Sequence, residues 1–135
     1  MIRVEVACAV IERKGELLIA QRKPGDSLSG YWEFPGGKRK DSESFAACLV
    51  REVREELGVL IQPRQFLRKV AYSYPEKQVS LHFYLCAWVS GAPSKKDCFD
   101  FRWVRPEALR SFLFPPADHD LIRDLIQRKR LYFGV

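Results

Sequence analysis

Three glutamates lie close together near the middle of the chain and could bind a metal ion. Glu52, Glu55 and Glu56 belong to the run R-E-V-R-E-E at 51–56. On a helix that turns by about 100° per residue they fall within an arc of roughly 100°. Crowded carboxylates repel one another unless a cation lies among them, and Mg²⁺ prefers oxygen ligands. A solvated helix face, with arginines softening the repulsion, is the simpler alternative for this run taken alone.

The glutamates belong to a longer pattern that separates these alternatives. From Gly37 the chain reads G-x5-E-x7-R-E-V-x-E-E-x-G-V, in which the first glutamate is Glu43 and the arginine is Arg51. This pattern resembles the defining box of the Nudix hydrolase family. At residue frequencies of a few per cent, a full match by chance is on the order of one in ten million. The resemblance implies an enzyme that hydrolyses the diphosphate linkage of a nucleotide.

The resemblance also implies a metal site. The ligands would be the Gly36 carbonyl and the carboxylates of Glu52, Glu55 and Glu56. Mg²⁺ would be the cofactor, and Mn²⁺ could substitute for it. Asp97 matches a position where some members have a further acidic ligand, and a plain loop carboxylate is an equal alternative there.

Four residues of the box are implied to be catalytic: Glu43, Arg51, Glu52 and Glu56. Arg51 would pair with Glu43 and orient the loop between them. The three glutamates of this set stay open as the general base, because members of the family differ on this point. The metal would neutralise phosphate charge and acidify a water molecule, while the protein positions the reactants.

Flanking motifs resemble the MutT-like branch, the nucleoside triphosphate pyrophosphohydrolases. They are L-I-A-Q-R at 18–22, the segment 31–38, W-V-R-P-E-A-L at 103–109 and F-P-P-A at 114–117. Members hydrolyse a nucleoside triphosphate to the monophosphate and pyrophosphate, and several remove oxidised nucleotides such as 8-oxo-dGTP. The resemblance therefore implies a role in nucleotide pool sanitation and DNA repair. By position, the nucleotide would contact Arg22, Phe34, Gly37, Lys38, Val79 and Asp118, with Val4, Val6 and Pro115 as further apolar walls.

Asp118 departs from part of this branch. Members specific for 8-oxo-dGTP have asparagine at the matching place, which both donates and accepts hydrogen bonds, whereas an ionised aspartate only accepts. Ionised Asp118 would suit the donor edge of guanine or the cytosine amino group, and a protonated Asp118 would donate as well. An N-cap role for the following helix is the alternative. Oxidised guanine, cytosine and broad specificity therefore all stay open.

The elements that must position these residues can be predicted from patterning. Apolar runs at 4–12 and 17–21, joined by R-K-G-E at 13–16, predict a β-hairpin. Tyr31–Phe34 predicts a short strand that P-G-G at 35–37 ends. Further strands are expected at 68–74, 79–88 and 99–104, with Val79, Leu81, Phe83 and Leu85 on one side of the second of these.

Two helices are predicted with a short helical turn at 106–109 between them. The first runs from Glu43 to Leu57, with Ser42 as N-cap, Glu43 in its first turn and Gly58 as its C-terminal stop. Its glutamates should point away from an apolar face. That face consists of Ala46, Leu49, Val50, Val53 and Leu57.

The second helix should span 118–129 and bury Leu121, Ile122, Leu125 and Ile126. A mixed sheet with these two helices packed on it is an α+β domain, and the resemblance implies the Nudix α/β/α sandwich. We expect residues 1–135 to form this single domain.

Composition agrees with a globular cytoplasmic protein. The chain has 135 residues, of which 47% are hydrophobic and 30% charged, and its net charge is +6. No stretch predicts a signal peptide or a membrane span, and the four cysteines form no C-x-x-C pair, so reduced thiols are expected. The expected partner is a small nucleotide, without nucleic acid or membrane, and both a monomer and a homodimer stay open.

Two alternative functions remain. The first is Nudix chemistry on another substrate, such as ADP-ribose, a sugar nucleotide, a dinucleoside polyphosphate or an RNA 5′ end. The second is a nucleotide-binding module without catalysis, which could dock nucleic acid through its positive surface. The complete set of box glutamates argues against this module.

Overall fold

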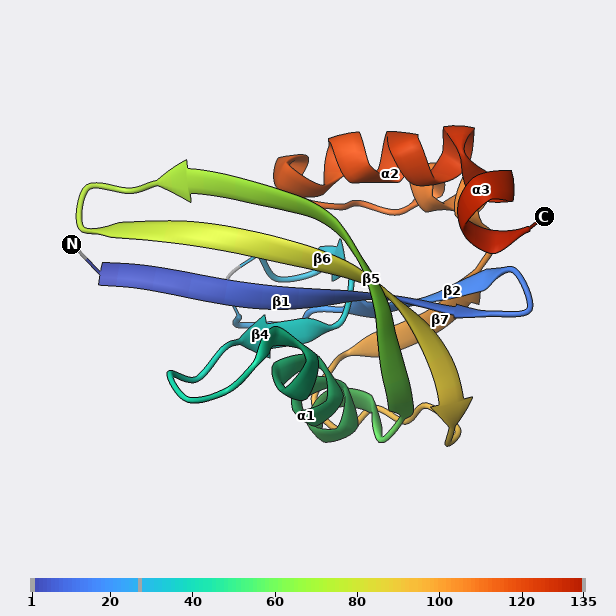
Figure 1. Ribbon diagram of the computed structural model, residues 1–135, viewed down its shortest axis with the longest axis horizontal. Helices are drawn as coiled ribbons and strands as arrows, with labels where there is room; N and C mark the ends of the chain where they lie inside the picture. Colours follow the sequence, from blue (N-terminus) through green and yellow to red (C-terminus); the bar gives the residue numbers. More distant parts are fainter. Residues whose placement is uncertain (1, 27, 135) are drawn as a thin grey trace.

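A mixed β-sheet lies between two helical layers (Figure 1). The computed structural model describes residues 2–26 and 28–134. Helix α1 (Phe45–Leu57) covers one face of the sheet, and α2 (His119–Gln127) with the short α3 (Lys129–Phe133) lies over the other. The predicted fold class is therefore confirmed.

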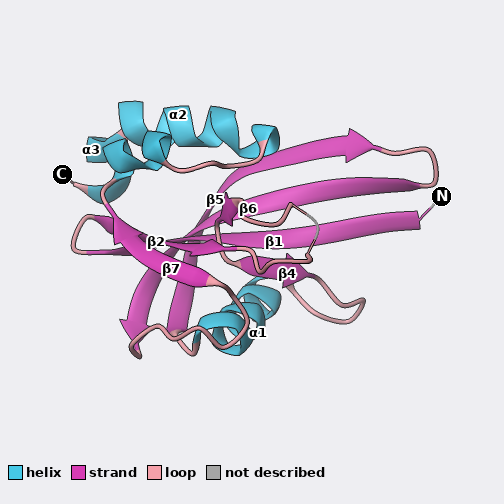
Figure 2. Cartoon of the chain, turned by 180° about the vertical axis from the view of Figure 1, so that it is seen from behind, coloured by secondary structure: helices cyan, strands magenta, loops and turns pink. Residues whose placement is uncertain are grey.

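Seven strands form the sheet, and β1 lies at its centre (Figure 2). β1 pairs in parallel with β6, and antiparallel with β2 and with β4. β5 is an outer strand beside β6, whereas β7 and β3 both pair with β2. The bounds are β1 Ile2–Arg13, β2 Glu16–Gln21, β3 Trp32–Glu33, β4 Gly36–Lys38, β5 Leu60–Ser73, β6 Lys77–Ser90 and β7 Asp100–Val104, with 3₁₀ turns at Pro106–Ser111 and Pro116–Asp118.

Alternation along β1 builds two cores, one on each face. Ala7, Ala9 and Ile11 pack toward α1, while Cys8 and Val10 pack toward α2. All five side chains are buried. This strand carries no exposed face over these positions, which is why its sequence is an almost continuous apolar run.

The predicted hairpin between β1 and β2 is confirmed. Arg13 pairs with Glu16, so Lys14 and Gly15 form a two-residue turn, in which both φ angles are positive (51° and 81°). Such turns match the twist of antiparallel strands, and glycine adopts positive φ without strain.

Three strand predictions need correction. β5 begins at Leu60, eight residues before the predicted Arg68, because register shifts near Pro63 and Phe66 interrupt the two-residue alternation that would reveal it. The strand predicted at 31–34 is reduced to Trp32–Glu33. The glycines expected only to end it instead form β4, which pairs with residues 6–8 of β1.

The start of α1 also differs from the prediction. Ser44, not Ser42, is the N-cap, and its hydroxyl accepts a hydrogen bond of 3.0 Å from the Ala47 N–H. Glu43 therefore lies before the helix, where hydrogen bonds from Arg51 hold its carboxylate. Ala46 is exposed, since the buried face is rotated toward Cys48 and Glu56. Gly58 ends the helix with a φ of 72°, as predicted.

The C-terminal helix is divided. The helical hydrogen bonds of α2 end at Gln127, and α3 begins at Lys129 after an irregular residue, Arg128. Of the predicted apolar stripe, Leu121, Ile122 and Leu125 are buried, and Ile126 packs partly buried against the same core.

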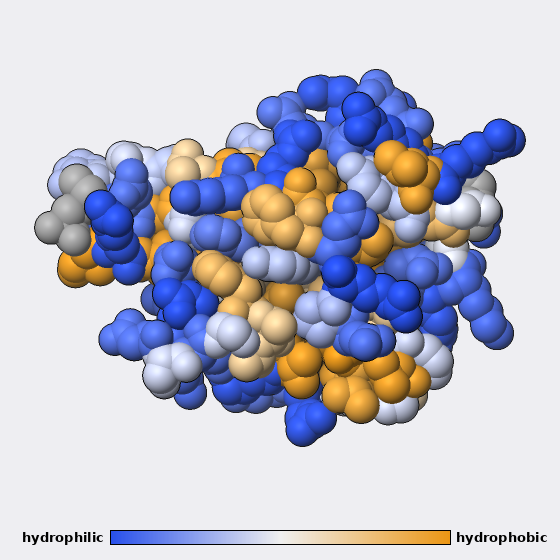
Figure 3. Space-filling model, viewed as in Figure 1, coloured by the Kyte–Doolittle hydropathy of each residue, from blue (hydrophilic) through white to orange (hydrophobic). Residues whose placement is uncertain are grey.

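The surface is mixed. On the face drawn in Figure 3, apolar side chains form separate areas between charged ones. In the described part of the chain, no helix is long and apolar enough to span a bilayer.

Candidate active site

One cavity collects residues from many parts of the chain. Its volume is about 410 Å³, and it lies where β1, β3, β4, β6, the C-terminal half of α1 and the segment before α2 meet. A cavity of this size falls within the range that binds small organic ligands. Twelve of the predicted residues line it: Val6, Arg22, Phe34, Gly36, Gly37, Lys38, Glu52, Glu56, Val79, Asp97, Pro115 and Asp118.

Four other predicted residues do not line this cavity. Glu43 lies behind the cavity in the loop before α1, and Arg51 lies behind it on α1 itself. The Glu55 side chain is 59% exposed and lines a groove on the outer side of α1 with Ala46 and Val50. Val4 lies at a shallow depression near the far end of β1.

Glycines allow close contact between the cavity wall and its acids. A Cβ atom on Gly37 would lie 2.3 Å from the Glu52 carboxyl carbon, so a side chain here would displace that carboxylate. A Cβ atom on Gly36 would lie 1.9 Å from the Ala7 carbonyl oxygen, where β4 pairs with β1. Gly37 therefore leaves room for the Glu52 carboxylate to rest against the β4 backbone, and Gly36 allows β4 to approach β1 closely.

Glu56 is the most unusual acid of the cavity. Only 9% of the residue is exposed, and its Oε1 atom is buried without a hydrogen-bond partner among the described residues. Burial, followed by repulsion from Glu33, Glu52 and Asp97, raises its pKa to about 9. A carboxyl group in this condition stays protonated at neutral pH unless a cation approaches it.

An ion-pair network behind the cavity holds the loop before α1. The Arg51 guanidinium donates to both oxygens of Glu43, at 2.6 Å from Nε and 2.9 Å from Nη2. It also donates to Glu52 at 2.8 Å and to the Lys38 carbonyl at 3.2 Å. The two hydrogen bonds from Arg51 to Glu43, together with the bond from the Lys40 N–H, lower the pKa of Glu43 to about 2. Arg51 thus links Glu43 to the strand and to a cavity glutamate.

Asp97 approaches the same end of the cavity from the segment after β6. Its backbone N–H donates to the Glu56 carbonyl at 3.0 Å, which attaches this segment to α1. Its side chain is 65% exposed and forms an ion pair of 2.5 Å with the Lys23 ammonium group.

The opposite end of the cavity is apolar, with one buried acid. Phe34, Val79 and Pro115 line it beside Asp118, which is 6% exposed. Asp118 occupies the N-cap position of α2, yet its side chain makes no capping hydrogen bond. Burial, with a smaller contribution from Glu33, raises the Asp118 pKa to about 7. Its carboxyl group therefore can both donate and accept near neutral pH.

Glu33 is a cavity residue that the sequence analysis did not select. It lies on β3 and lines the cavity, and its carboxylate accepts a hydrogen bond of 2.9 Å from Arg22. Burial raises its pKa, while the Arg22 guanidinium opposes that rise. The signal was present, because Glu33 is the one acid within the aromatic segment Tyr31–Phe34.

The acidic end of the cavity fits a divalent cation. No cluster of three His, Cys, Asp or Glu side chains is preassembled for a metal among residues 2–26 and 28–134. However, the buried Glu56 oxygen lacks a partner, and the Glu52 carboxylate lies against glycine backbone. These are oxygen donors, which hard cations prefer, and a cation there would offset the burial and the repulsion that together raise the Glu56 pKa.

Comparison with known proteins decides the family. The model of the NUDIX domain matches residues 6–124. The chain belongs to the NUDIX family. It is 38% identical over 101 residues to an 8-oxo-dGTP diphosphatase from Buchnera aphidicola (subspecies Acyrthosiphon pisum), which covers 75% of this chain and 82% of the relative. It is 33% identical over 119 residues to the CTP pyrophosphohydrolase of Escherichia coli K12, which covers 88% of each.

Solved structures agree with this assignment. The solution structure of the E. coli ORF135 protein superposes with a TM-score of 0.82 at 29% identity, covering 100% of this chain and 96% of that one. The MutT protein from Methanosarcina mazei superposes with a TM-score of 0.83 at 24% identity, covering 96% of each chain, which is evidence for the fold. NUDIX hydrolases generally use a divalent metal ion, in agreement with the acidic end of the cavity.

Proposed function

We propose that this chain hydrolyses a (deoxy)nucleoside triphosphate to the monophosphate and pyrophosphate in the presence of Mg²⁺, and that its substrates are cytosine nucleotides and oxidised guanine nucleotides such as 8-oxo-dGTP. One observation carries the proposal. A single cavity has Glu52 and the partnerless Glu56 at one end and an apolar wall with Asp118 at the other. This arrangement suits a molecule with a phosphate chain and a flat base.

Relatives support this choice of substrate class. Two of them are named 8-oxo-dGTP diphosphatase and CTP pyrophosphohydrolase. We assign base recognition to Asp118 and Glu33, since both carboxyl groups line the cavity and both have raised pKa values. A carboxyl group that can both donate and accept, as that of Asp118 can near neutral pH, suits the amino group and ring nitrogen of cytosine and the amide edge of oxidised guanine.

At the acidic end, the Gly36 carbonyl, Glu52 and Glu56 would hold Mg²⁺, with Glu55 and Asp97 joining them when they turn inward. A bound Mg²⁺ neutralises phosphate charge and lowers the pKa of a coordinated water molecule. Lys38 and Arg22 line the cavity and would contact further phosphate oxygens.

Hydrolysis adds water across a phosphoanhydride bond, and the water proton passes to a carboxylate. We assign the general base to Glu52 or Glu56, because both line the cavity. Glu43 lies outside it, and a pKa of about 2 makes Glu43 a weak proton acceptor. Its role is to position Arg51.

A substrate panel with product analysis tests the proposal. CTP, dCTP, dGTP, 8-oxo-dGTP, ADP-ribose and a sugar nucleotide should be compared by kcat/KM, because discrimination is expressed in that ratio. We expect pyrophosphate and a monophosphate from a cytosine or an oxidised guanine nucleotide. Orthophosphate as the only phosphate product, or turnover limited to ADP-ribose or the sugar nucleotide, would refute it.

A further inference from the structure

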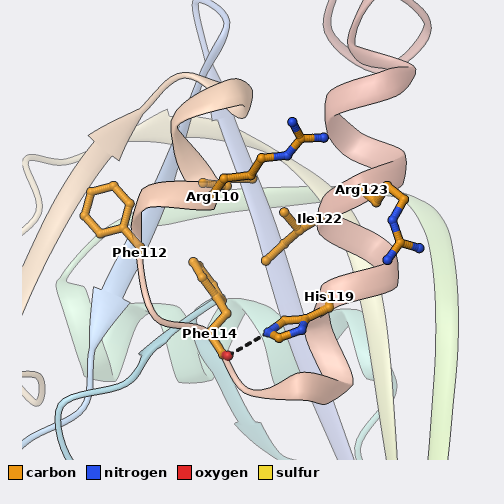
Figure 4. A pocket seen from close by; sticks show the side chains of 7 residues that line it. Arg110, Phe112, Phe114, His119, Ile122 and Arg123 are labelled. Carbon is orange, nitrogen blue, oxygen red and sulfur yellow. Dashed lines mark hydrogen bonds between the residues drawn. The ribbon is translucent and has the colours of Figure 1, made fainter.

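A second cavity lies on the other side of the segment that walls the nucleotide cavity (Figure 4). It is formed between the 3₁₀ turn Pro106–Ser111, residues 112–114 and α2, and its volume is about 240 Å³. The floor is apolar, since Leu109, Phe114 and Ile122 are buried there.

The rim of this second cavity is positively charged. Arg110 and Arg123 line it on opposite sides, one from the 3₁₀ turn and one from α2. Arg123 donates to Asp120 at 2.9 Å, but both side chains are more than half exposed, and such pairs are weak and exchange readily. Within the described residues, the Arg110 guanidinium has no carboxylate within 4.0 Å and no hydrogen bond.

From this geometry we infer that the second cavity binds a small organic anion, a single ring or branched chain with one carboxylate or phosphoryl group. The apolar floor would hold the ring, and Arg110 with Arg123 would bind the charged group. The volume of about 240 Å³ lies below the range for drug-sized ligands, which limits the occupant to about one ring. A whole nucleotide is too large for it.

Occupancy of this cavity is coupled to the nucleotide cavity. The Phe114 ring forms part of its floor and also packs on Phe34 of the nucleotide cavity, with ring centroids 5.2 Å apart. The chain then continues directly into Pro115 and Asp118, which line the nucleotide cavity. The His119 ring bonds to the Phe114 carbonyl at 2.9 Å across this segment (Figure 4). A ligand that fixes the segment changes nucleotide affinity, and the nucleotide changes ligand affinity by the same factor.

Trp32 provides a local reporter. Its indole packs edge-on against Phe112 of the second cavity, with centroids 5.0 Å apart. The chain has two other tryptophans, Trp88 and Trp103, and both contact Arg13. In an NMR titration, the Trp32 indole signal should therefore move while the other two stay in place.

The test is a titration of the purified protein with benzoate and phenyl phosphate, against benzyl alcohol and inorganic phosphate as controls. We expect the two aryl anions to shift the signals of Trp32 and Ile122 and to bind at least tenfold more tightly than either control. Arg110→Gln should weaken both aryl anions at least fivefold. Arg102→Gln, which removes an exposed arginine from β7, should leave them unchanged.

Three results would overturn the inference. Equal binding of benzyl alcohol would show that charge is not recognised, and equal binding of inorganic phosphate would show that the apolar floor is not used. Unchanged affinity in both Arg110→Gln and Arg123→Gln would exclude the proposed rim. These binding measurements need no turnover, so their outcome is independent of the proposed hydrolysis.

Discussion

The Glu56 carboxyl group lies at the edge of the buried face of α1, among other acids of the nucleotide cavity. We expect Glu56→Gln to lower kcat/KM by about 10²–10³-fold, because loss of one metal-binding carboxylate removes several kcal/mol of charge stabilisation. The fold should survive, since glutamine has the same shape and Glu56 is protonated when no cation is bound.

Steady-state kinetics with the best substrate measures this effect. Glu76→Gln is the matched control, because Glu76 is exposed at the turn between β5 and β6 and lies outside the cavity. Equal activity of the two variants would disprove the role of Glu56.

The raised pKa of Asp118 predicts that the stability of the folded protein depends on pH. Its pKa is about 7 in the folded protein, whereas an unfolded aspartate titrates near pH ~3.9. Because the folded state holds this proton more tightly, the contribution of Asp118 to wild-type stability should fall as pH rises from about 4 to about 7 and level off above that. Asp118→Asn lacks this contribution. The free energy of unfolding of the variant minus that of wild type should therefore be about 2–4 kcal/mol larger at pH 8 than at pH 4.

Urea unfolding at several pH values, without metal or nucleotide, measures this difference. Glu33 and Glu56 also have raised pKa values, but both residues are present in both proteins and their contributions largely cancel. A constant stability difference between pH 4 and pH 8 would show that the Asp118 carboxyl group is not desolvated.

At the scale of elements, the loop between β4 and α1 depends on Arg39. Its guanidinium donates to the Glu43 carbonyl at 2.8 Å and to the Lys40 carbonyl at 3.3 Å, and it pairs with Glu5 of β1. It also lies 5.1 Å from the centre of the Phe45 ring. Arg39 therefore anchors the loop that presents Glu43 to Arg51.

We expect Arg39→Met to lower kcat by about tenfold or more, because the loop loses its charged hydrogen bonds and the pair of Glu43 with Arg51 is no longer held in place. Arg39→Lys should recover part of the rate, since one ammonium group can still bond to Glu5 or to one carbonyl. Arg64→Met, at an exposed position of β5, is the control. Kinetics should be compared with urea stability, and a loss of stability without loss of kcat would contradict this assignment.

The elements also show what the sequence could and could not predict. The helical spacing of Leu49, Val53 and Leu57 located α1 within two residues, because its buried face has a clear period. Its start was misplaced because two serines, Ser42 and Ser44, are equally good caps in sequence, and tertiary bonds to Glu43 decide between them. The first half of β5 was missed because β-bulges disrupt its alternation.

At the scale of the molecule, the site predictions depended on the resemblance more than on periodicity. Residue patterns cannot say that Asp118, Glu33 and Glu56 face one cavity, because they lie far apart in the chain and meet only through the sheet topology. The box motif selected Glu52 and Glu56, and both line the cavity. The outward position of Glu55 could not be predicted, since a helical wheel does not fix side-chain direction.

The proposed function requires a cation held by Glu52 and Glu56 against the phosphates of a nucleotide whose base lies beside Asp118. NMR relaxation by substoichiometric Mn²⁺, with a non-hydrolysable CTP analogue bound, tests this most directly. We expect the strongest broadening at the amide signals of Gly37, Glu52 and Glu56, and weaker broadening at Asp118. Broadening centred on the acids of α2, or no broadening at the Glu52 and Glu56 signals when nucleotide is saturating, would contradict it.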